Sequence, residues 1–135
     1  MKYIMVAKNY LNYHPKAGQP TGFRESILSG RKVHTIRATA GNKKTGDTVS
    51  LRQWEGKPYA SKQVEFAQCE IKITPIVITP LILQMDLERI ADFDGFDHTK
   101  DFIDWFTGGK TDQLHFEGVC IWFRNVRAIA KKTKE

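Results

Sequence analysis

The stretch GRKVHTIR, residues 30–37, marks the place where the chain changes from helix to strand. Gly30 can end a preceding helix in the left-handed conformation. The β-branched residues after it favour an extended chain. Lys32 is therefore expected at a helix-to-strand corner, where a side chain can point into a cleft. The density of side chains in this stretch that bind ligands or transfer protons suggests a functional site.

Upstream of this stretch, the pattern predicts a strand at residues 3–7 and then a long loop at residues 8–20. Loops of that length are often functional. Thr21 can cap a short helix in which Phe23, Ile27 and Leu28 share one face. That helix leads directly to Gly30.

Downstream, apolar alternation predicts strands at residues 33–37, 48–54, 62–78 and 116–126, with a turn at Gly46–Asp47. Pro75 should mark a bend or a sheet edge, because proline cannot donate to a central ladder. Residues 81–106 change to helical periodicity, with a break at Asp94–Gly95 and an end at Gly108–Gly109.

These elements predict an α+β fold, most simply a small mixed β-barrel of about five to six strands with flanking helices. The length of 135 residues fits one domain over residues 1–126, followed by a basic tail at residues 127–135 that we expect to be frayed and flexible. A barrel of this size encloses no large cavity. A ligand should therefore bind at its mouth, between Lys32 and the insertion around Asp94.

Charge is segregated along the chain. Residues 1–63 hold twelve lysines and arginines against three acids, whereas residues 86–104 hold seven acids against two bases. Such a field favours phosphate-bearing partners, although a basic surface without a partner explains it equally well. Cys69 and Cys120 lie in apolar segments and are interpreted as core residues. No stretch has the length of a signal peptide or a membrane span, so we expect no membrane association and a cytoplasmic monomer.

The helix ending in Gly30, followed by Lys32, Thr35 and Arg37 and then by the Gly46–Asp47 turn, resembles the ASCH domain, the activating signal cointegrator homology family within the PUA-like barrels. The similarity covers most of residues 21–125, including the helical stretch around residues 90–106. It implies a PUA-like barrel that recognises RNA or nucleotides.

One branch of that family consists of small bacterial amidohydrolases that remove the acyl group from N(4)-acetylcytidine. The resemblance places the catalytic lysine at Lys32 and the catalytic threonine at Thr35. The family's glutamate has its nearest counterpart in Asp94, which is one methylene shorter, while Glu88 and Asp92 lie close enough for the alignment to slip. The resemblance implies a catalytic trio of Lys32, Thr35 and Asp94.

The chemistry sets a condition on this trio. A lysine acts as a base only when desolvation or neighbouring cations lower its pKa, and Arg31, His34 and Arg37 are such neighbours. Lys32 and Thr35 would point to opposite faces of a regular strand, so a shared site requires Lys32 to lie before the strand or on a bulge. The ordinary interpretation is that these residues are solvated charges and a strand threonine, with Arg37 paired to a carboxylate such as Asp47.

Arg31 and Arg37 are candidate ligand-binding cations beside Lys32. Trp54 and Tyr59 flank a turn that contains Lys57, an arrangement that can stack a base beside a phosphate-binding cation. His34 is interpreted as a strand side chain. His14, His98 and His115 lack metal-ligand spacing, so we expect neither a metal nor another cofactor.

Two hypotheses follow. The first is a binding module that recognises RNA or a modified nucleotide through Lys32, Thr35 and Arg37. The second is a metal-independent amidohydrolase acting on N(4)-acylated cytidine or a related nucleobase. A protein-interaction domain is a third alternative, supported only by the opposed charges.

Overall fold

The computed structural model describes residues 1–82, 84–109 and 114–129. Five strands and three helices follow one another in these segments: β1 (Tyr3–Met5), α1 (Phe23–Leu28), β2 (His34–Arg37), β3 (Thr48–Trp54), β4 (Gln63–Ile78), α2 (Gln84–Phe93), α3 (Thr99–Thr107) and β5 (Phe116–Ala128). The predicted α+β class is confirmed. None of the described helices has the length and apolar character needed to cross a membrane.

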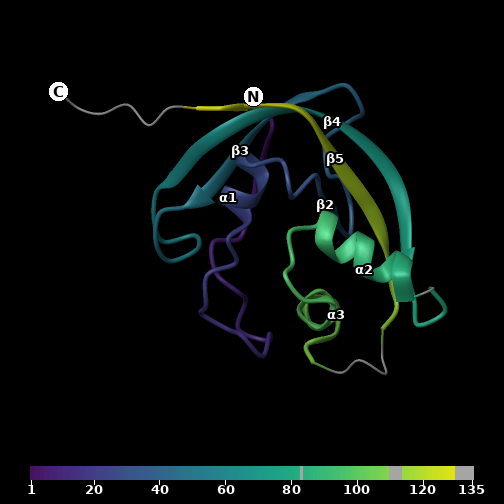
Figure 1. Ribbon diagram of the computed structural model, residues 1–135. Helices are drawn as coiled ribbons and strands as arrows, with labels where there is room; N and C mark the ends of the chain where they lie inside the picture. Colours follow the sequence, from purple (N-terminus) through teal and green to yellow (C-terminus); the bar gives the residue numbers. More distant parts are fainter. Residues whose placement is uncertain (83, 110–113, 130–135) are drawn as a thin grey trace.

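The strands form one mixed sheet in the order β1-β3-β4-β5-β2. β1 pairs with β3 in parallel, and the other pairs are antiparallel. The long strands β4 and β5 curl into an arch, with the helices on its concave side (Figure 1). The predicted barrel is therefore present as a curled, barrel-like sheet whose edge strands are β1 and β2.

Pro75 lies within β4, opposite Val119 of β5. The ladder between β3 and β4 ends at the pair Thr48 and Glu70, so beyond that point β4 has lost β3 as its neighbour. On that side the Ile73 amide already donates to the Thr45 hydroxyl rather than to a strand. The absent N–H of Pro75 therefore interrupts no ladder, and the predicted sheet edge is confirmed.

The core fills the concave side of the sheet. Phe66, Ile71 and Ile121 of the long strands are nearly inaccessible to solvent, as are Ile27 of α1 and Phe102 of α3. The predicted core position of both cysteines is confirmed, and burial raises the pKa of each thiol to about 12. The predicted face of α1 was wrong at one residue, because Leu28 at the end of the helix is exposed.

Helix ends agree with the glycine pattern. Gly30 follows α1 at φ +85°, Gly95 separates α2 from α3 at φ +90°, and Gly108 ends α3 at φ 64°. The expected start of the helical region at Leu81 was too early, because α2 begins at Gln84. The expected tail begins too early as well: Arg127 and Ala128 continue β5 and pair with Gln68 and Ala67 of β4. Residues 130–135 of that tail lie outside the described residues.

Candidate functional site

Lys32 lies before β2 rather than within it. Its backbone N–H, like that of Arg31, donates to the carbonyl of Ser26 in α1, and this turn separates it from the strand that starts at His34. Because Lys32 is not part of the strand, the alternation of side chains along a strand does not force Lys32 and Thr35 to point to opposite faces. The predicted condition for a shared site is met at this corner.

The Lys32 ammonium is buried against the turn between α2 and α3. Nζ donates to the Asp94 carbonyl oxygen at 2.6 Å and to Asp94 Oδ1 at 3.1 Å. The side chains of Lys32 and Asp94 are 3% and 6% exposed, so this is an ion pair largely removed from water. The structure therefore brings together two of the three residues that the resemblance implied.

Burial lowers the pKa of Lys32 below its ordinary value of 10.5, against the opposing effect of Asp94. The charge of Arg37 lowers it further. The ring of Phe23 lies under the ammonium, with Nζ 4.4 Å from the ring centroid. Lys32 is thus held in surroundings that favour its neutral form more than water does, as a lysine base requires.

His34 completes this buried cluster. Its Nδ1 donates to Asp94 Oδ1 at 3.1 Å, and its ring packs edge-on against Trp122 with the centroids 4.7 Å apart. The sequence interpretation of His34 as an ordinary strand side chain missed this contact. No local signal could have revealed it, because His34 and Asp94 are 60 residues apart.

Arg37 is the residue that links the two edge strands of the sheet. From β2, its Nη2 donates to the carbonyl oxygen of Met5 in β1 at 2.6 Å, and its Nε donates to the Thr35 hydroxyl oxygen at 3.2 Å. The expected pairing with Asp47 does not occur, because Asp47 instead pairs with Lys2 at 2.8 Å. Burial lowers the pKa of the Arg37 guanidinium, and the charge of Asp94 opposes this effect.

A cleft of about 530 Å³ opens beside Arg37, between the end of β2, the end of α3 and the start of β5. We call it the Arg37 cleft. Its lining combines Arg37 with four aromatic residues and with small or aliphatic neighbours: Tyr13, Ile36, Arg37, Ala38, Trp105, Phe106, Thr107, Gly108 and Phe116. The volume lies within the range of small-molecule sites. In the described residues, Arg37 Nη1 makes no hydrogen bond, so this group retains a donor for a ligand.

The Arg37 cleft does not include the place where a ligand was expected from the sequence. A site at the mouth between Lys32 and Asp94 was expected, and there these two side chains contact each other. The cleft lies instead beyond Thr35, on the Arg37 side. Thr35 is itself buried at 7% exposure, and its hydroxyl oxygen is the direct link to Arg37.

Arg31 binds the turn between α2 and α3 through ion pairs and a hydrogen bond. Its guanidinium contacts Asp92 at 3.2 Å and Asp97 at 2.5 Å, and it donates to the Phe96 carbonyl at 2.7 Å. The hydrogen bond to Asp97 raises the pKa of the Arg31 guanidinium above its ordinary value. These contacts give Arg31 a structural role at the turn, and its role in ligand binding stays a prediction.

Trp54, Lys57 and Tyr59 form the tip of the hairpin between β3 and β4. The rings of Trp54 and Tyr59 lie with centroids 5.2 Å apart, and Tyr59 is 90% exposed. None of these three residues lines the Arg37 cleft. The stacking place that the sequence suggested is therefore separate from the aromatic residues of the Arg37 cleft.

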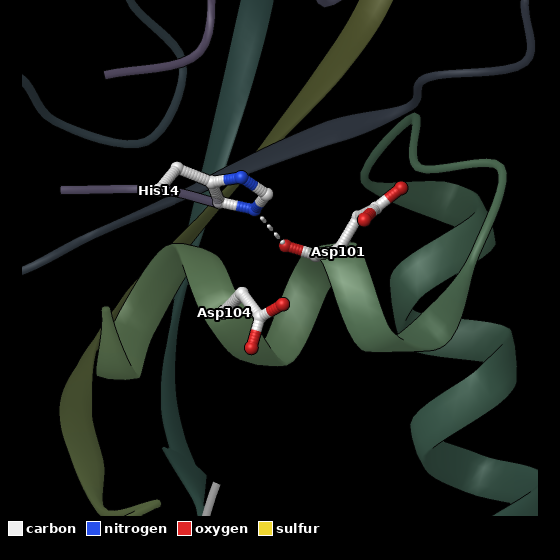
Figure 2. A group of neighbouring side chains, drawn as sticks. All are labelled: His14, Asp101 and Asp104. Carbon is white, nitrogen blue, oxygen red and sulfur yellow. Dashed lines mark hydrogen bonds between the residues drawn. The ribbon is translucent and has the colours of Figure 1, made fainter. Parts of the chain in front are cut away.

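His14, Asp101 and Asp104 are brought together although they are distant in sequence, with candidate ligand atoms within 4.8 Å of one another (Figure 2). The lack of metal-ligand spacing in the sequence did not reveal this proximity, because His14 is far from both aspartates along the chain. The Lys16 N–H donates to its Nδ1, so Nε2 carries the proton and donates to the Asp101 carbonyl. Asp101 and Asp104 each pair with a lysine at 2.6 Å. These bonds anchor the 8–20 loop on α3 and leave no ring nitrogen for a metal.

Comparison of this chain with protein-family models, with curated proteins and with solved structures finds no match. The resemblance to the ASCH domain consequently remains a prediction from the residues quoted above. The geometry of the Arg37 cleft and of the Lys32–Asp94 pair is therefore the basis on which a function is inferred.

Proposed function

We propose that this protein recognises a nucleobase, of RNA or of a modified nucleotide, in the Arg37 cleft. The observation that supports this proposal is the combination of one available guanidinium donor with the aromatic side chains of Tyr13, Trp105, Phe106 and Phe116 in a single cleft. Aromatic side chains stack on the faces of bases, and arginine donates to their carbonyl oxygens. The ASCH resemblance implies the same class of ligand.

The cleft is organised before a ligand arrives. Arg37 is held by Met5 and Thr35, and Trp105 packs against Phe23, Phe96 and Tyr10 with ring centroids 5.7, 5.7 and 5.9 Å away. Side chains already fixed by packing lose little entropy on binding. Tyr13, which is half exposed, is the lining residue most free to close over a base.

The test is an equilibrium titration with cytidine and N(4)-acetylcytidine, using Tyr13→Ser and a matched control, Tyr59→Ser. Both variants remove an exposed tyrosine, but only Tyr13 lines the cleft. Stacking on an aromatic residue contributes about 1–3 kcal/mol per base. We expect Tyr13→Ser to weaken binding at least about fivefold and Tyr59→Ser to leave it unchanged. The reverse result would move the binding site to the β3–β4 hairpin and reject this proposal.

A second function, hydrolysis of an acylated nucleobase amine, is favoured by one specific observation, the contact between Lys32 Nζ and Asp94 Oδ1. In such a reaction, water adds to the acyl carbon, the bond from that carbon to the amine nitrogen breaks, and the nitrogen takes a proton. A lysine with a lowered pKa can accept the proton of the attacking water and return it to the leaving amine. Asp94 would hold Lys32 in position.

Release of cytidine from N(4)-acetylcytidine tests this second function, with Lys32→Ala, Asp94→Asn and the surface variant Lys44→Ala assayed in parallel. If the protein hydrolyses this substrate, we expect the Lys44 variant to keep the turnover of the unaltered protein. The Lys32 and Asp94 variants should lose turnover while their circular dichroism spectra stay native. Binding without turnover in the unaltered protein would reject hydrolysis and leave nucleobase recognition standing.

A further inference from the structure

A second hollow lies beside the N-terminus, lined by Met1, Lys2, Tyr3, Asn42 and Lys43, with a volume of about 530 Å³. We call it the Lys43 hollow. It joins the start of β1 to the loop between β2 and β3. The same loop begins at Ala38, which lines the Arg37 cleft. One short loop therefore contributes to both concavities.

Of the two lysines that line this hollow, Lys43 makes no ion pair with a carboxylate of the described residues. Lys2 is paired with Asp47 at 2.8 Å. In the described part of the chain, the one hydrogen bond of Lys43 Nζ is to the Ala40 carbonyl, at the long distance of 3.5 Å. The ammonium is half-buried and available to an anion.

Lys43 is also close enough to other cations to be affected by them. Burial lowers the pKa of Lys43, and the charges of Arg37 and Lys2 lower it further. Positive charges held near one another in partly buried positions are stabilised by a bound anion. Asp47 opposes this attraction, but its charge is compensated by Lys2 and by the Lys44 backbone N–H, which donates to it at 2.8 Å.

We propose that the Lys43 hollow binds the phosphate of the nucleotide whose base occupies the Arg37 cleft. This inference rests on the proposed function, because the cleft supplies the base contacts. Arg37, which lines the cleft, is near enough to Lys43 for its charge to lower the pKa of Lys43. It narrows the ligand from a free nucleoside to a phosphorylated one. The phosphate can be the monoester of a nucleotide or a diester within RNA.

The experiment compares cytidine, cytidine 5′-monophosphate, a short oligocytidine RNA and inorganic phosphate as ligands. The test variant is Lys43→Gln. The matched control is Lys44→Gln, which makes the same charge change one residue away but lies outside the lining of the hollow. Each protein is titrated at low salt, where phosphate contacts are strongest.

We expect the monophosphate to bind about tenfold more tightly than cytidine, since a charge-assisted hydrogen bond contributes on this scale. Lys43→Gln should abolish most of that difference and leave cytidine binding unchanged, and Lys44→Gln should preserve the difference. If the RNA binds more tightly than cytidine but the monophosphate does not, the bound phosphate is identified as a diester. If the monophosphate binds more tightly than cytidine but the RNA does not, the bound phosphate is identified as a terminal monoester.

Other outcomes separate this proposal from the proposed function. Equal affinities for cytidine, its monophosphate and the RNA would overturn the phosphate site and keep the nucleobase cleft. Binding of inorganic phosphate that Lys43→Gln loses, without any binding of cytidine, would overturn the nucleobase cleft and retain an anion site. A parallel loss of cytidine and monophosphate binding in Lys43→Gln would overturn the phosphate assignment.

Discussion

A lysine buried next to an aspartate carries a cost that its partners must offset. Lys32 loses its hydration at 3% exposure and gains two hydrogen bonds to Asp94 and the face of Phe23. Such pairs contribute little net stability, whereas removal of one partner leaves a buried charge and costs about 3–5 kcal/mol. Net stability alone therefore does not account for the cluster of Lys32, Asp94 and His34.

The lowered pKa of Lys32 predicts a pH dependence. Between the folded-state pKa and 10.5, the unfolded chain binds more protons than the folded chain, so the free energy of unfolding rises with pH. We expect the unaltered protein to gain stability relative to Lys32→Met as the pH is raised from about 7 to about 10, by at most about 1.4 kcal/mol per pH unit. Urea denaturation at a series of pH values measures this difference.

Lys44→Met serves as the control, because it makes the same substitution at an exposed position. A difference between Lys32→Met and the unaltered protein that stays constant over this pH range would show that Lys32 titrates normally. That result would also remove the basis for a lysine base in hydrolysis.

At the residue scale, sequence reasoning identified Lys32, Thr35, Arg37 and Asp94 but not their contacts. The position of Lys32 before β2 could be anticipated, because Gly30 and the strand alternation are local signals. The bond from Arg37 to Met5 and the bond from His34 to Asp94 could not, because each joins residues brought together only by the tertiary fold.

At the element scale, the turn between α2 and α3 positions the site. Gly95 has φ +90°, and a Cβ atom there would lie 3.1 Å from Lys32 Cδ and 3.2 Å from Phe23 Cδ1. The absence of a side chain at this position allows Asp94 to approach Lys32. Arg31 holds the same turn from outside through Asp92 and Asp97.

Gly95→Ala should therefore destabilise the protein more than Gly18→Ala. Gly18 has a similar φ of +83°, but the Cβ that alanine would add there meets no atom within 4 Å, so both variants incur backbone strain of about 1–2 kcal/mol. Crowding against Lys32 and Phe23 should add about 1–3 kcal/mol in Gly95→Ala alone. Equal losses in urea denaturation would show that the close approach of Lys32 to the turn is unimportant.

The order and type of the elements were largely predictable, because proline, glycine and apolar periodicity are local. Pro75 at the edge and the break at Gly95 are examples. The Arg37 cleft was not predictable, because it forms where the 8–20 loop, β2, α3 and β5 meet. Its aromatic residues belong to separate segments, and only the tertiary arrangement makes them neighbours.

At the scale of the whole molecule, opposite charges that are separated in sequence meet in the fold. Arg31 contacts Asp92 and Asp97, Lys32 contacts Asp94, and Lys16 contacts Asp101. The acidic helices thereby neutralise part of the basic N-terminal half. In the described residues, Arg37 and Lys43 are hydrogen-bonded to backbone carbonyl oxygens and are not paired with carboxylates.

This distribution predicts a modest salt dependence for RNA binding. Each phosphate contact to a single strand contributes a slope of about −0.7 in a plot of log affinity against log salt concentration. With one phosphate contact, from Lys43, a short oligocytidine should give a slope of magnitude about 0.7, and cytidine should give a slope near zero. A much steeper slope for RNA would indicate binding over a broad basic surface instead.

The most direct measurement of the proposed nucleobase site follows the three tryptophan indole N–H signals by NMR during titration with cytidine 5′-monophosphate. Trp105 lines the Arg37 cleft, Trp54 lies on the β3–β4 hairpin, and the Trp122 indole donates to Thr74 at 3.0 Å. Trp54→Phe and Trp105→Phe assign the signals. We expect the Trp105 signal to shift in a saturable manner while that of Trp54 stays fixed. A shift of Trp54 alone, or three unchanged signals at millimolar ligand, would contradict nucleobase recognition in the Arg37 cleft.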